Sequence, residues 1–178
     1  VWTTMINIVT NNSVLLQYWH HEQTFPRWYK DSTALKSITR KAFLEFCAKC
    51  WRIYEINDTA LLYCETLQKD IVNIHFSLVR GTDVSTDALK SIRKDLLGEF
   101  KTIYGWVLRQ NRGLKKICRE LGLEANGVKM IEGTSHNKPL VWECYMLKRK
   151  YIIKNPQILL NSWWWTSVTL LASLFGSH

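Results

Sequence analysis

Apolar residues recur at three- and four-residue intervals along much of the chain, and this spacing predicts amphipathic helices. The first helix is expected from about Ser32 to Glu55, with Asp31 or Ser32 as its N-cap. A second helix, capped within Asn57-Asp58-Thr59, would end at Gly81. The buried stripes would consist of Leu35, Ile38, Ala42, Phe43, Phe46, Cys50, Ile53 and Tyr54 in the first helix and of Leu67, Ile71, Ile74 and Leu78 in the second.

A third helix is expected after Ser85, because apolar residues keep the helical spacing from Leu89 through Ile92, Leu96, Phe100 and Ile103 to Val107. Residues 1–17 and 140–153 lack this spacing and are expected to contain short extended segments. The pattern therefore predicts a mainly α fold, one compact helical domain over residues 1–178. With only 8 Gly and 3 Pro, the chain does not resemble a turn-rich β-sandwich.

Residues 113–133, GLKKICRELGLEANGVKMIEG, resemble the helix-turn-helix of DNA-binding proteins. The resemblance rests on a small residue in the first helix (Cys118), a glycine at the turn four residues later (Gly122) and Leu123 beneath that turn. The same residues also resemble a SAP motif, a small helical DNA binder. The helix-turn-helix resemblance implies that Asn126 and Lys129 face a groove of the nucleic acid. The alternative is an ordinary helical corner in which Gly122 is only a C-cap.

The charge is distributed unevenly. The chain of 178 residues has a formal net charge of +9, and residues 1–89 contribute nothing to it, with nine Lys/Arg and nine Asp/Glu. Residues 90–154 carry fifteen Lys/Arg and six Asp/Glu, which accounts for the whole +9. Such asymmetry predicts an acidic partner, which can be nucleic acid, anionic lipid or an acidic protein face.

Together these features predict a non-catalytic nucleic-acid-binding component of a larger assembly. A helical scaffold (residues 32–110) would support a basic motif region (residues 111–154). The expected nucleic-acid contacts are Arg109, Arg112, Lys115, Lys116, Arg119, Asn126, Lys129, Lys148, Arg149 and Lys150.

Residues 155–178 carry no charged side chain, and they include three consecutive tryptophans. This tail is expected to pack on the protein or on other subunits through Trp163, Trp164, Trp165, Leu170, Leu171 and Phe175. The alternative function is an accessory or assembly subunit of a membrane-associated, organellar complex docked through residues 157–176, because aromatic residues and upstream lysines suit a membrane surface.

Metal binding and catalysis find little support in the sequence. Cys47 and Cys50 have zinc-ligand spacing, and His20 and His21 can complete four ligands, but a second pair is missing, so no metal and no cofactor are expected. No phosphate-binding loop or nucleophile motif is present, and His75 is expected to be a satisfied histidine rather than a base. Five cysteines and no signal-peptide pattern favour an intracellular location, mitochondrial or nuclear among others.

Overall fold

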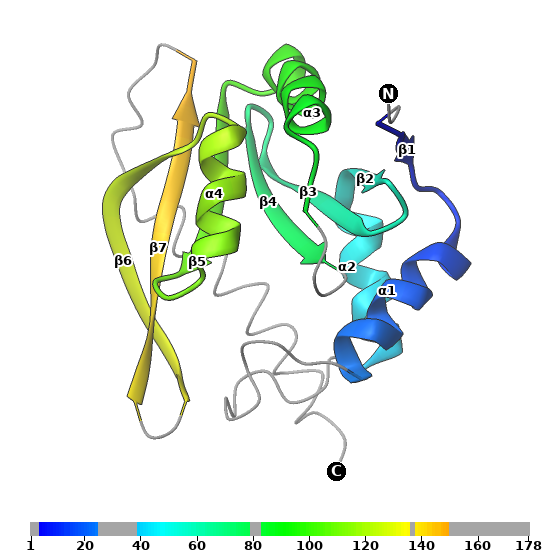
Figure 1. Cartoon of the computed structure of the whole chain (residues 1–178), viewed down its shortest axis with the longest axis horizontal. Helices are drawn as coiled ribbons and strands as arrows, with labels where there is room; N and C mark the ends of the chain where they lie inside the picture. Colours follow the sequence, from blue (N-terminus) through cyan, green and yellow to red (C-terminus); the bar gives the residue numbers. More distant parts are fainter. Residues whose placement is uncertain (1–3, 25–38, 79–82, 136–137, 150–178) are drawn as a thin grey trace.

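The computed structural model describes residues 4–24, 39–78, 83–135 and 138–149. Its centre is a seven-stranded sheet in the order β1-β2-β3-β4-β5-β7-β6 (Figure 1). Neighbouring strands are antiparallel except for β4 and β5, which run parallel. The strands are β1 (Ile6–Ile8), β2 (Cys50–Ile56), β3 (Ala60–Gln68), β4 (Ile71–Leu78), β5 (Thr102–Leu108), β6 (Glu124–Ser135) and β7 (Lys138–Lys148). The helices are α1 (Asn12–Thr24), α2 (Arg40–Lys49), α3 (Thr86–Glu99) and α4 (Arg112–Glu120).

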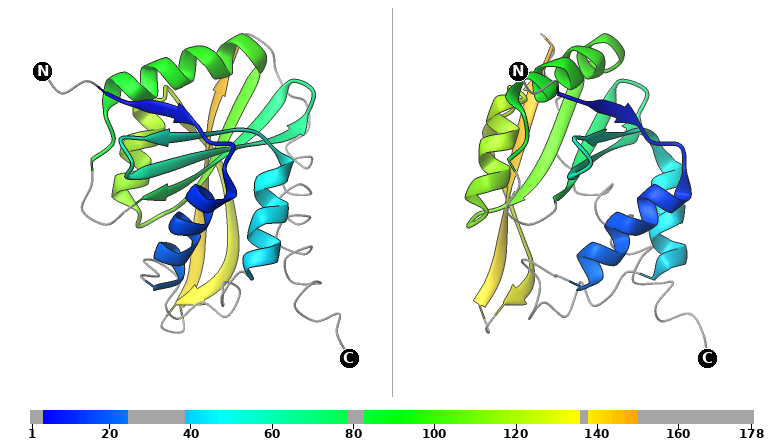
Figure 2. Two further views of the ribbon diagram at one scale, coloured as in Figure 1. Left: turned by 90° about the vertical axis from the view of Figure 1, so that its right-hand side faces the viewer. Right: turned by 45° about the vertical axis from the view of Figure 1, so that its right-hand side comes forward.

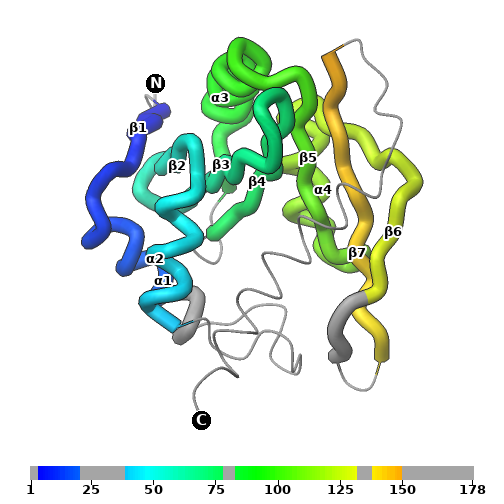
Figure 3. The backbone as a smooth tube through the Cα atoms, turned by 180° about the vertical axis from the view of Figure 1, so that it is seen from behind, coloured from blue at the N-terminus to red at the C-terminus, as the bar shows by residue number. Residues whose placement is uncertain are grey.

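The helices cover the two faces of the sheet. α3 and α4 bury one face, where Leu89, Leu96 and Cys118 belong to the main hydrophobic cluster. α1 and α2 pack on the other face of β2–β4, where Leu15, Phe43 and their neighbours form a second cluster. Figures 2 and 3 show α1 and α2 beside β2–β4 and away from β6 and β7. The two faces of β4 therefore meet different helices.

The expected mainly α fold is wrong, because the end of the first predicted helix and nearly all of the described part of the second are strands. Of the first, only α2 is helical within the described residues, and the chain continues directly into β2. The second is a β3–β4 hairpin with its turn at Lys69-Asp70. Leu61 and Leu62, on opposite faces of β3, are both completely buried. A strand buried on both faces shows no alternation, so its apolar residues can also match a helical spacing by chance.

The third predicted helix is half right. α3 begins at Ser85, whose hydroxyl accepts a hydrogen bond from the Ala88 N–H, and ends with Phe100 as its C-cap. Ile103 and Val107, which the helical stripe included, belong instead to β5, in which every residue is buried. β1 and β7 lie in the segments expected to be extended, but residues 12–17 begin α1.

Residues 113–133 do not form a helix-turn-helix or a SAP motif. Their first half is α4, but their second half is the long strand β6, which pairs with β7. Gly122 does form the turn, at φ 82°, and the Arg93 guanidinium lies against it, 2.5 Å from where a Cβ would be. Glycine is favoured there because other residues rarely adopt positive φ.

Candidate active site

The two parallel strands at the centre of the sheet diverge. β4 and β5 pair only from Ile71–Thr102 to Ile74–Gly105, although β4 continues to Leu78 and β5 to Leu108. Figure 1 and the right-hand view of Figure 2 show the two halves of the sheet spreading apart beyond this point. The β5-facing edge of residues 75–78 thus has no strand partner in the described part of the chain. Unpaired backbone N–H and C=O groups can bind a ligand that offers amide groups.

Gly105 stands at the last paired position, next to Ile74 of β4 and Cys118 of α4. A Cβ added there would lie 3.4 Å from Ile74 Cγ1 and 3.6 Å from Cys118 Sγ. The carboxyl ends of β4 and β5 lead to α3 and α4 respectively. Open α/β sheets bind ligands outside the carboxyl ends of their parallel strands, so this divergence is the candidate active site.

A cluster of buried polar side chains lies at the same point, on the face of the sheet that α2 covers. His75 is the first β4 residue beyond the last β4–β5 pair. Its Nε2 lies 2.9 Å from Glu65 Oε2 and 3.1 Å from Asn73 Nδ2. The Phe46 ring of α2 packs edge-on against the imidazole, with ring centroids 5.1 Å apart. Glu65 and Asn73 are 7% and 1% exposed, which is unusual for such polar residues.

One atom of this cluster has no partner. The buried Oδ1 of Asn73 makes no hydrogen bond within the described structure. Buried polar atoms are nearly always hydrogen-bonded, so an orphaned one indicates a place where a ligand or water binds. Asn73 also faces Tyr104 across the last stretch of parallel pairing.

The cationic residues expected to hold nucleic acid are mostly occupied with internal contacts. Lys115 of α4 forms a 2.6 Å ion pair with Glu143 of β7, and both side chains are over four-fifths buried. Arg109 Nε lies 3.6 Å from the same carboxylate. Lys129 is opposite Glu143 in the β6–β7 register. Lys115 and Arg109 therefore share one carboxylate, and the Lys115 pair fastens α4 to β7.

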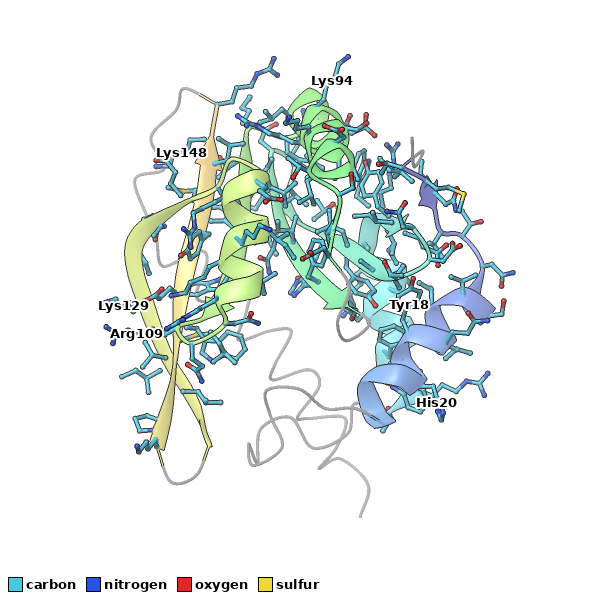
Figure 4. The ribbon with its side chains drawn as sticks, viewed as in Figure 1. Tyr18, His20, Lys94, Arg109, Lys129 and Lys148 are labelled. Atoms are coloured by element: carbon cyan, nitrogen blue, oxygen red, sulfur yellow. The ribbon has the colours of Figure 1, made fainter. Side chains whose placement is uncertain are left out.

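The remaining predicted contact residues are dispersed. Arg112 is the exposed first residue of α4, Lys116 lies 3.8 Å from Glu120, and Arg119 donates to the Lys115 carbonyl. Asn126 accepts from the Val128 N–H and donates to Cys144 Sγ, so it shapes a local turn. Lys148 ends β7 and Arg149 donates to the Leu97 carbonyl at 2.7 Å, while Lys150 lies outside the described residues. In Figure 4, Arg109 and Lys129 lie far along β6–β7 from Lys148.

The structure gives no support to the zinc ligand set. No group of three or more potential ligands occurs among the described residues. Cys47 is buried on α2, Cys50 begins β2, and His20 and His21 lie on α1. All five cysteines are free thiols. Burial raises the pKa of Cys47, Cys64, Cys118 and Cys144 to about 12, and it also raises the pKa of Cys50.

These thiols should be unreactive in the folded protein. Because the thiolate is the nucleophile and its formation is suppressed by burial, we expect iodoacetamide at pH 8 to leave all five cysteines essentially unmodified. In denaturant all five should be alkylated within minutes, as intact-mass spectrometry can show. Rapid native labelling of Cys47, Cys64, Cys118 or Cys144 would contradict their buried placement.

The tail residues Trp163, Trp164, Trp165, Leu170, Leu171 and Phe175 lie outside the described residues. Within the described part of the chain, no helix has the length and apolar character needed to span a bilayer.

Solved structures with the same fold are acetyltransferases. An N-acetyltransferase from Staphylococcus aureus Mu50 superposes with a TM-score of 0.62 at 12% identity, covering 83% of this chain and 99% of that one. The yncA protein of Salmonella typhimurium, solved with its cofactor acetyl-CoA, gives 0.66 at 7% identity, covering 87% and 99%. A Salmonella typhimurium enzyme that modifies the N-terminal serine of ribosomal protein L7/L12 gives 0.62 at 12%, covering 84% and 97%. The sequence matches no protein-family model and no curated protein.

The chain thus has the N-acetyltransferase fold, and this corrects the functional expectations. A non-catalytic nucleic-acid-binding component and a membrane-docked assembly subunit are both contradicted, because the structural neighbours are acetyltransferases and the helix-turn-helix is absent. The same finding contradicts the predicted partners, which were nucleic acid, other subunits and a membrane surface. The net positive charge is real, but two of the predicted contact residues, Lys115 and Arg109, are paired with Glu143.

Sequence reasoning did not single out Glu65 and Asn73, and it set His75 aside as a satisfied histidine rather than a base. The detectable signal was a set of polar residues inside strongly apolar strands, but it has meaning only once the hairpin register is known. That register places Glu65 opposite Asn73 and brings His75 to the next position on the same face.

Proposed function

We propose that this protein transfers an acetyl group from acetyl-CoA to an amine. The observation that carries the proposal is the divergence of β4 and β5 after Ile74–Gly105 in a chain with the acetyltransferase fold. When bound, acetyl-CoA supplies a thioester whose C–S bond breaks as the C–N bond forms, with one ammonium proton passing to the thiol and a second being released.

The strand edge fits the amide-bearing arm of this cofactor. Residues 75–78 offer backbone donors and acceptors with no strand partner in the described structure, and they lie next to the cluster around His75. Amide groups of the arm can pair with such an edge as an added strand does. The residues present therefore fit the arm.

The start of α3, where the diphosphate of the cofactor would bind, carries both positive and negative charge. The first N–H groups of α3 lack helical acceptors and carry partial positive charge, which favours an anion. Lys90 and Arg93 of α3 add cationic charge nearby in sequence. However, Asp87 lies in the first turn and Glu120 Oε2 accepts from Thr86 Oγ1 at 3.2 Å. These carboxylates oppose the phosphates, so affinity should depend strongly on the charge at this helix start.

Calorimetric titration with acetyl-CoA tests the proposal directly. Asp87→Asn should tighten binding about twofold to fivefold, because a charge near a helix terminus contributes about 0.3–1 kcal/mol. The matched control is Glu99→Gln at the opposite end of α3, which should leave affinity unchanged. Amine-dependent release of CoA thiol, with acetylated product identified by mass, should accompany binding. Absence of binding and of thiol release with a broad amine panel would refute the function.

A further inference from the structure

We propose that His75 accepts the proton of a primary ammonium substrate at Nδ1, that Glu65 positions its imidazole, and that Asn73 contacts the same substrate. This inference deepens the proposed function, on which it rests, by assigning the acceptor side of the site. It is argued from the contacts of three side chains on β3 and β4.

The position of the ring proton follows from the carboxylate. Glu65 Oε2 lies 2.9 Å from His75 Nε2, a hydrogen-bond distance, and one of the two groups must donate. An imidazole is the stronger base, so the shared proton belongs on Nε2 and the carboxylate accepts it. In a neutral ring this leaves Nδ1 with a lone pair. A carboxylate that fixes the tautomer in this way is how catalytic histidines are commonly oriented.

Nδ1 is placed to act on a substrate. Nδ1 makes no hydrogen bond within the described residues. The His75 side chain is 27% exposed, whereas the Glu65 side chain is only 10% exposed. Phe46 packs edge-on against the ring and restricts its rotation. The histidine therefore has one nitrogen oriented by a carboxylate and one without a hydrogen bond in the described residues, at the point where β4 leaves β5.

Asn73 is the independent indication of a ligand. Its amide lies against His75 through Nδ2, and its Oδ1 is buried without a partner. With Nε2 protonated, Nδ2 faces a ring N–H and finds no acceptor there. If the amide turns over, Oδ1 accepts from the Nε2–H and Nδ2 takes the buried position without a partner, so at least one end is unsatisfied in either orientation. Leaving a buried polar atom unpaired is costly, and a polar substrate atom beside His75 would remove that cost.

The tautomer is the first test and needs no catalysis. Long-range ¹H–¹⁵N correlation spectra at pH 8 should show His75 protonated at Nε2 and bare at Nδ1. Butylammonium chloride should shift the Nδ1 resonance, whereas tetramethylammonium chloride, which has no N–H, should not. Glu65→Gln should shift the ring toward the other tautomer. A wild-type ring protonated at Nδ1 would overturn the proposal, whether or not the protein acetylates amines.

Kinetics supply the second test. His75→Gln should lower kcat at least about 100-fold with unchanged acetyl-CoA affinity, as loss of a general base requires. Imidazole should partly restore turnover to His75→Ala. His20→Gln, on the exposed surface of α1, is the matched control and should behave as wild type (Figure 4). An active enzyme whose kcat is insensitive to His75 would refute the base while leaving acetyl transfer intact. Failure to bind acetyl-CoA would refute the function instead.

Discussion

Replacing Lys115 with alanine should destabilise the protein by about 2–3 kcal/mol, because it leaves the mostly buried Glu143 with a weaker partner. Only 16% of Lys115 and 18% of Glu143 are exposed, and their charged atoms are 2.6 Å apart. Removing one member of a buried pair costs roughly 3–5 kcal/mol. We expect about 2–3 kcal/mol, less than this usual cost, because Arg109 remains 3.6 Å from the same carboxylate.

Urea denaturation followed by circular dichroism measures this loss, and the melting temperature should fall by roughly 5–10 °C. Lys116→Ala is the matched control, since that side chain is 68% exposed and 3.8 Å from Glu120. Exposed pairs contribute little, so the control should change stability by less than about 0.5 kcal/mol. A double replacement, Lys115→Met with Glu143→Leu, should recover much of the stability, because no buried charge is then left unpaired. Equal losses for Lys115→Ala and Lys116→Ala would contradict the buried pair.

The same residues show why charge density along the chain misled the functional interpretation. Lys115 lies on α4 and Arg109 directly follows β5, and the sequence cannot show that both reach Glu143. A run of cations without neighbouring acids looks like a binding surface. Folding placed the compensating carboxylate on β7, a strand that is distant in sequence from α4.

Helical periodicity was informative only where the helix is packed on one face. α2, most of α3 and α4 lie within the predicted helical segments, and Leu89, Ile92 and Leu96 are buried as the stripe requires. It failed for β3, β4 and β5, in which apolar residues face helices or other aromatic residues on both sides. The β3–β4 turn at Lys69-Asp70 contains no glycine or asparagine, so the usual hairpin signal was missing.

The candidate site depends on this unpredicted hairpin. Glu65 and His75 are ten residues apart and belong to no recognisable motif. If residues 59–80 formed a helix, nothing would indicate that these two side chains act together. Only the antiparallel register of β3 and β4, together with the end of β4–β5 pairing, turns them into neighbours at an opening in the sheet. The chemistry therefore arises from pairing register, which sequence periodicity does not report.

Leu96→Ala should destabilise the protein by about 3–4 kcal/mol, because it removes a completely buried side chain that holds α3 on the sheet. Buried Leu→Ala changes cost about 2.7–5 kcal/mol through lost burial and the cavity left behind. The adjacent Leu97 is only partly buried against the same cluster, so Leu97→Ala should cost about 1 kcal/mol. The urea midpoints of the two variants measure this difference, because both variants replace leucine with alanine at adjacent positions of α3. If the two substitutions cost the same, α3 is rotated from the orientation described, and its first turn would no longer border the opening between β4 and β5.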